Sequence, residues 1–212
     1  MRKSFPLLML FAPACLLSAA ETALGVPFRE ADKYYLQKPK TPVAWDKTFV
    51  TFSEFRGSWS STIQTFAKVA GMELITINPP PDHNVCGIYD KVDGSKFYSL
   101  KEAFDIINEK LLGATHHTLI RSGDILYLIS ADELYDALPR LDRLALRDLR
   151  GRGNTEIVEI VVRFDPDHQG QVKKWLGEFG LVIPQENGGF VLQGTVASLT
   201  LCARLFRWNE EP

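Results

Sequence analysis

Hydrophobic positions fall into two blocks of short strands and helices, separated by a charged stretch. In the first block, residues 47–54 alternate as a strand does, and a helix with an apolar face follows. The apolar positions of that helix are Trp59, Ile63, Phe66, Ala67 and Ala70. A short strand is predicted at 73–77, and a prolyl loop leads to a weaker strand candidate at 85–92.

The rest of the first block predicts a capped helix and a hairpin. Residues 99–102 read Ser-Leu-Lys-Glu, a capping box in which the serine and glutamate side chains satisfy free backbone N–H groups. The helix that follows should turn Phe104 and Ile107 toward the sheet. Two short strands within 118–129 flank a turn containing glycine, which predicts a hairpin.

The second block, residues 155–208, predicts the order β-α-β-β-α. After its first strand, Asp165 and Pro166 favour the start of a helix. That helix should bury one stripe of apolar side chains. The stripe consists of Val172, Trp175, Leu176 and Phe179. Two strands joined by a glycine-rich turn follow, and Thr195 caps the last helix.

A charged connector, residues 133–154, separates the blocks. It is rich in arginine between Arg140 and Arg152, with Asp142 and Asp148 among the arginines. The stretch is either a basic contact patch or a solvated linker whose charges pair locally. Local pairing is favoured, because acidic and basic residues are interspersed.

The N-terminal residues form a separate pattern. Residues 1–20 contain two basic residues, an apolar run and then small residues, the order typical of a cleaved signal peptide. Residues 21–46 have little periodicity and several prolines, which indicates a linker or extended arm. We therefore expect an exported protein that begins near Glu21. A lipoprotein signal with Cys15 at its lipobox is ranked lower than cleavage after Ala20.

Composition argues against a polyanion-binding protein or an enzyme. The 212 residues include 24 basic and 26 acidic side chains, a net charge of −2. This balance creates no overall basic field to hold nucleic acid. The sequence has no phosphate-binding loop, nucleophile elbow or paired-carboxylate motif. We expect a non-catalytic protein without a cofactor.

Histidines and cysteines offer one weak alternative, a zinc site. His83 and Cys86 are three residues apart, and His116 and His117 are adjacent. Nothing in the spacing brings these pairs together, and neighbours in a strand point to opposite faces. We therefore predict no metal site. Cys86 and Cys202 lie in different blocks and are predicted to be separate buried thiols rather than a disulfide.

Taken together, the two blocks resemble the first two N-terminal periplasmic domains of bacterial secretins, the outer-membrane pore subunits of secretion and pilus systems. The first block also resembles the secretin and TonB short N-terminal domain. The similar stretches include YSLKEAFDII at 98–107, TLIRSGDILYLI at 118–129 and GGFVLQG at 188–194. The resemblance covers roughly residues 47–207 and rests mainly on the order of the elements.

The resemblance implies an α+β fold of two small modules. The first, residues 47–132, is β-α-β-β-α-β-β, and the second, 155–208, is a KH-like β-α-β-β-α. It implies a periplasmic or outer-membrane-associated protein that binds envelope proteins, among them secretin or secretion-system components, or assembles into a ring of its own copies. Secretin pore function is not implied, because residues 1–212 hold no counterpart of the pore region. The alternative is an extracytoplasmic domain that binds a ligand or senses a signal.

The predicted contact residues lie in the second module. Phe190, Val191 and Leu192 form a strand that we predict to be a sheet edge, and such edges pair readily with a partner strand. Trp208 and Trp45 lie at module ends. For these two, exposed aromatic contact and packing at the module junction both remain open.

Overall fold

The computed structural model describes residues 44–55, 57–81, 96–134, 140–186 and 188–208. All of these residues belong to one compact unit, Pro39–Pro212. The predicted signal peptide, most of the predicted arm and the strand candidate at 85–92 lie outside the described residues. Among the helices that the structure describes, none is long and apolar enough to cross a membrane.

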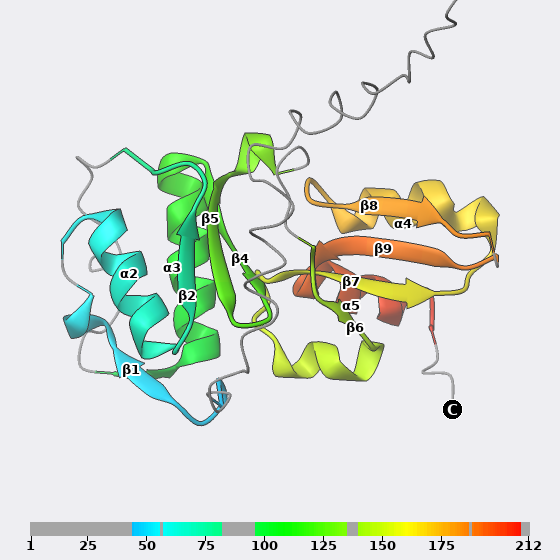
Figure 1. The fold of residues 1–212 in the computed structure, drawn as a ribbon. Coiled ribbons are helices and arrows are strands. Elements are labelled where there is room, and N and C mark those ends of the chain that lie inside the picture. The colour runs from blue at the N-terminus through cyan, green and yellow to red at the C-terminus, as the bar shows by residue number, and fades with distance from the viewer. Residues whose placement is uncertain (1–43, 56, 82–95, 135–139, 187, 209–212) are drawn as a thin grey trace, which may run out of the picture. The chain divides into compact units, whose positions relative to one another are not determined.

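The fold is α+β, with two modules in sequence (Figure 1). The elements of the first module are β1 (Phe49–Thr51), α2 (Trp59–Val69), β2 (Glu73–Thr76), β3 (Phe97–Ser99), α3 (Leu100–Thr115), β4 (His117–Ser122) and β5 (Ile125–Ser130). Strands β1 and β3 pair antiparallel as a two-stranded ribbon. Strands β2, β5 and β4 form a three-stranded sheet in that order, with β2 parallel to β5.

Short sequence signals set the helix ends of the first module. The Ser58 hydroxyl accepts the N–H of Ser61 at the start of α2, and Gly71 takes a positive φ beyond its end. The predicted capping box of Ser99 and Glu102 is confirmed at the start of α3. The backbone N–H of Ser99, donating to the Glu102 carboxylate, is the main cause that lowers the pKa of that carboxyl.

The core of the first module is largely aromatic. The predictions for Phe104 and Ile107 are confirmed, since both are fully buried between α3 and the sheet face that carries Leu119. Trp45 packs inside this core, with its ring 5.8 Å from the rings of Phe66 and Phe104. Trp45 thus makes no exposed contact, and it packs in the core of its own module rather than at the module junction.

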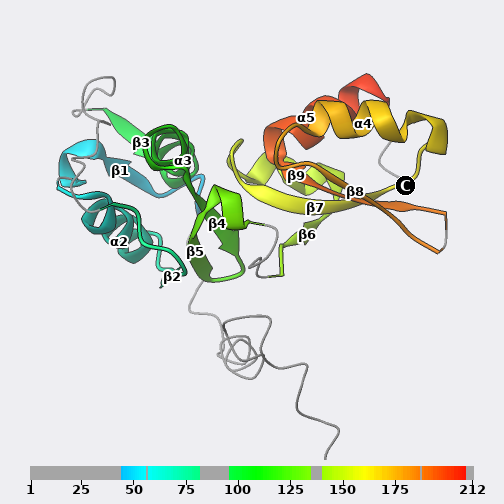
Figure 2. The ribbon, with the colours of Figure 1, turned by 90° about the horizontal axis from the view of Figure 1, so that it is seen from above.

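The second module has the predicted order β-α-β-β-α, preceded by one strand from the connector. Its elements are β6 (Arg143–Leu144), β7 (Ile157–Val162), α4 (Gln169–Leu176), β8 (Leu181–Pro184), β9 (Phe190–Thr195) and α5 (Val196–Leu205). They form one sheet in the order β6-β7-β9-β8. Both helices lie on the same side of this sheet (Figure 2) and share a core with it. Asp165 and Thr195 accept the capping hydrogen bonds predicted for them.

Trp175 is not a core residue, and its predicted burial is wrong. Helix α4 turns Val172 and Leu176 into the core, whereas Trp175 is 48% exposed. The predicted stripe assumes a helix that continues to Phe179. The helix instead ends before Gly177, because a φ of 74° is not helical. Only two of the four predicted residues, Val172 and Leu176, are therefore buried in this core.

We expect Leu176→Ala to lower the free energy of unfolding by about 2–5 kcal/mol, because its buried side chain would leave a cavity. Trp175→Ala, one position earlier, should cost at most about 1 kcal/mol, because half of that side chain is already in water. Urea unfolding followed by circular dichroism measures both. Equal losses would contradict the assignment of the helix faces.

Candidate functional site: the module junction and the contact surfaces

The described part of the charged connector is exposed at some positions and packed at others. Leu141 is buried, and Arg152 is only 14% exposed. The predicted local pairing is present, since Arg152 pairs with Asp142 and Arg147 with Asp148. The prediction of a solvated linker is wrong only in part, because most of the described arginines are exposed, whereas Leu141, Leu149 and Arg152 are packed.

An apolar cluster joins the two modules and the connector. The face of the three-stranded sheet that points away from α2 and α3 contributes Ile120, Ile125, Tyr127 and Ile129. Leu134 and Leu141 of the connector and Ile157 at the start of β7 complete the buried part of the cluster, and Phe179 packs against it. The first sheet is therefore covered on both faces.

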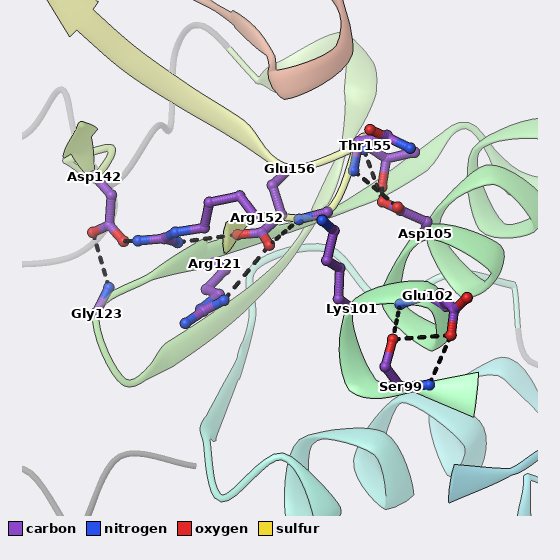
Figure 3. Close-up of polar contacts among 12 residues, drawn as sticks. Ser99, Lys101, Glu102, Asp105, Arg121, Gly123, Asp142, Arg152, Thr155 and Glu156 are labelled. Atoms are coloured by element: carbon purple, nitrogen blue, oxygen red, sulfur yellow. Dashed lines mark hydrogen bonds and ion pairs between the residues drawn. The ribbon is translucent and has the colours of Figure 1, made fainter. Parts of the chain in front are cut away.

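A buried carboxylate, Glu156, lies at the centre of the polar junction (Figure 3). Only 1% of its side chain is exposed. Its Oε1 accepts the N–H of Gly153 at 2.7 Å and lies 3.5 Å from the Arg121 guanidinium, while its Oε2 accepts from Arg152 at 3.0 Å. Burial alone would lower the pKa of Arg152, but Glu156 and Asp142 raise it. The carboxylate is thus paired from β4 and from the connector.

The two arginines are themselves held by further contacts. Arg152 also donates to Asp142, whose Oδ1 accepts the N–H of Gly123 in the β4–β5 turn at 3.0 Å. The Arg121 guanidinium lies 3.9 Å from the ring centre of Trp45, a cation–π contact. Burial lowers the pKa of Arg121. The charge network therefore connects the aromatic core of the first module to the second.

A second carboxylate, Asp105 of α3, holds the start of the second module (Figure 3). Its Oδ1 accepts the N–H and the hydroxyl of Thr155, both at 2.8 Å, and its Oδ2 accepts the N–H of Asn154 at 2.8 Å. Hydrogen bonds to an ionised acceptor are the strong ones. A Cβ at Gly153 would lie 2.7 Å from the Asp105 Oδ1, so this close approach requires glycine.

Two more polar residues of α3 lie on the same face as Asp105. Lys101 donates to the backbone carbonyl of Arg150 at 2.9 Å, and the Oδ1 of Asn108 accepts the N–H of Leu119 at 2.7 Å. The spacing i, i+4, i+7 puts them in one row along the helix. Sequence analysis missed this row. Its signal in the sequence was Asn108, a polar residue placed among the apolar positions Phe104, Ile107 and Leu111.

The strand predicted to be an edge lies inside the sheet. Strand β9 runs between β7 and β8, and Val191 has partners in both, Val161 and Ile183. Phe190, Val191 and Leu192 are buried. The edge prediction is wrong because β8 pairs with one edge of β9 and β7 pairs with the other. A charge at Val191 would therefore disturb the core.

Trp208 packs against its own module. Its ring stacks on Phe206 and Phe164, with ring centres 5.7 Å and 5.6 Å apart. The side chain is half-buried, so intramolecular packing already uses much of its surface.

Exposed apolar side chains occur elsewhere among the described residues. They are Phe49 and Phe97 on the β1–β3 ribbon, Trp175, Leu201 and Leu205 on the helices of the second module, and Val161 and Ile183 on its sheet. In the ribbon, Phe49 lies opposite Ser99 and Phe97 opposite Thr51. Both phenylalanines therefore point to the same outer face.

Among the described residues, the histidines and cysteines do not come together as a metal site. His83 and Cys86 lie outside the described residues, and no group of three or more metal-binding side chains occurs within them. His116 is exposed in a left-handed conformation, whereas His117 is buried. Cys202 is a buried free thiol, and burial raises its pKa to about 11.

Replacing Glu156 with glutamine should lower the free energy of unfolding by about 3–5 kcal/mol, because two arginines would lose the carboxylate that they share. Glu159→Gln is the matched control. Its partner Arg143 is 57% exposed, so that loss should stay below about 1 kcal/mol. Chemical unfolding measures both, and similar small losses would show that the buried pair does not hold the junction.

Gly153→Ala should destabilise the protein by about 1–3 kcal/mol, because its new methyl group would press on the Asp105 carboxylate. In an Asp105→Ala background, the same change should cost less, because the obstructing oxygen is gone. A double-mutant cycle measures this coupling. Strictly additive losses would mean that Asp105 does not impose the glycine.

Comparison with known proteins shows distant similarity to solved structures. No family model matches the chain, and no curated protein matches it. A solved structure described as the crystal structure of the enterotoxigenic Escherichia coli GspC-GspD complex from the type II secretion system is similar, with a TM-score of 0.26 and 12% sequence identity. The match covers 72% of this chain and 94% of that chain.

Proposed function

We propose that this protein is a non-catalytic, exported protein of the cell envelope that works by binding other proteins. Its partners are components of a type II-like secretion system or further copies of the chain arranged in a ring. The order of the two modules supports this proposal through their resemblance to secretin N-domains. The observation that carries it is the exposed aromatic pair on the β1–β3 ribbon.

The ribbon presents two large apolar side chains to solvent. Phe49 is 56% exposed and Phe97 is 69% exposed. Aromatic side chains are enriched at interfaces, where a few of them supply most of the binding energy. Among the residues that the structure describes, neither outer edge of this ribbon is paired with another strand. A partner can therefore contact both the aromatic face and a strand edge.

The same ribbon is anchored firmly from behind. Val50 and Tyr98, which alternate with the exposed residues, are buried, and the Tyr98 ring packs edge-on against Phe52 at 5.2 Å. At its far end, the N–H of Leu100 donates to the carbonyl of Thr48. The exposed phenylalanines thus sit on a fixed support, which lowers the entropy lost on binding.

Phe49→Asp/Phe97→Asp should abolish partner binding and leave the fold intact, because both side chains are mostly in water. The matched control, Ser61→Asp/Gln64→Asp, adds the same charge at exposed positions of α2 and should keep binding. A photocrosslinking residue at position 97 in living cells, followed by mass spectrometry, identifies the partner.

We expect a secretion-system protein or a second copy of the chain to be captured. A wild-type protein that stays monomeric and captures no envelope protein from position 97 would overturn the proposal in favour of ligand sensing. Equal loss of binding in the two double variants would show that added charge, rather than the aromatic pair, matters.

A further inference from the structure

Helix α5 has apolar residues on both its inner and its outer side. Val196, Leu199 and Cys202 pack into the core of the second module. On the other side, Leu201 is 41% exposed and Leu205 is 50% exposed. Grouped apolar residues that remain exposed often mark a contact surface. The outer side of α5 is therefore suited to a contact beyond its own module.

Basic residues accompany these exposed apolar side chains. Helix α4 carries Lys173 and Lys174, α5 carries Arg204, and Arg207 follows directly. Neither helix contains an aspartate or glutamate, although the whole chain has a net charge of −2. Among the ion pairs between described residues, none involves these four cations. The two helices and Arg207 thus carry four cations and no acidic side chain, while Asp165, Asp167 and Glu178 lie just outside α4.

The two helices form one layer on the sheet of the second module. They lie side by side on the same sheet face, as Figure 2 shows, and both pack into one core. Their outward residues therefore share one surface. Trp175, which is 48% exposed, belongs to this layer and directly follows the two lysines.

We propose that the outer surface of α4 and α5 binds an anionic lipid bilayer. Its cations complement lipid phosphates, and its leucines and tryptophan suit the boundary between headgroups and acyl chains. Tryptophan is the side chain enriched at that boundary. A protein partner fits less well, because lysine is depleted from protein interfaces, whereas here two lysines directly precede the exposed tryptophan.

Vesicle binding tests this proposal with the full chain. The probes are vesicles of phosphatidylcholine with phosphatidylglycerol added, compared with pure phosphatidylcholine vesicles, and binding is measured by sedimentation. We expect tighter binding to the anionic vesicles and weaker binding at high salt, because exposed charges are screened. Each basic residue near such a surface contributes roughly fivefold in affinity.

Lys173→Gln/Lys174→Gln should therefore weaken binding to anionic vesicles roughly 25-fold. The matched control, Lys47→Gln/Lys68→Gln, removes two exposed charges from the first module and should bind as the wild type does. Since both variants share the same N-terminal residues, a difference between them reports on the helix surface. Leu201→Ser/Leu205→Ser should also weaken binding while melting at a temperature close to that of the wild type.

Three results would overturn the proposal. The wild type could bind both kinds of vesicle equally or not at all, or the two lysine variants could lose affinity equally. A crosslinker at position 175 that captures an envelope protein, without any preference for anionic vesicles, would identify a protein-binding surface instead. Phe49→Asp/Phe97→Asp should bind vesicles normally, so this test is independent of the proposed function.

Discussion

Glu156 has almost no contact with water, so the protein must supply the partners that water would otherwise provide. Two arginines do so, Arg121 from β4 and Arg152 from the connector. The turn at Gly153 adds a backbone N–H, and this turn keeps its shape because Asp105 holds the residues that follow it. One buried charge thus determines where a strand, a connector and a helix meet. Removing its partners would leave an unpaired ion in a desolvated site, which is far more costly than losing a surface pair.

The same junction also fixes the last helix. The N–H of Val196 donates to the carbonyl of Glu156 at 2.9 Å, and the N–H of Ala197 donates to that of Asn154 at 3.0 Å. The first turn of α5 therefore obtains its backbone partners from the segment that Asp105 holds. Together with the Thr195 hydroxyl, which accepts the N–H of Ser198, these bonds satisfy the free N–H groups of the first turn. The outer surface of α5 consequently depends on residues that lie far from it in the sequence.

Features that depend on neighbouring residues could be predicted from the sequence, whereas features that depend on distant residues could not. The capping box at Ser99 and the caps at Asp165 and Thr195 involve neighbouring residues, so a few letters suffice to identify them. The position of β9 inside its sheet depends on which strands lie beside it, and nothing within the strand encodes that. Glu156 looked like an ordinary residue at the start of a strand. Its role arises only when Arg121, 35 positions earlier, is brought to it.

The exposed apolar residues contrast with the interior of the described structure, which is well packed. A chain that pairs a buried carboxylate twice and covers both faces of its first sheet nonetheless leaves Phe97 and Leu205 at least half in water. Single exposed apolar residues are ordinary on protein surfaces. Here, however, they occur in groups on elements that are otherwise well packed, the β1–β3 ribbon and α5. Their chemical surroundings also differ, because the ribbon offers strand edges while the helices offer cations. Under the two proposals, the ribbon engages a protein partner and the helices engage an anionic bilayer, each recognised by its own chemistry.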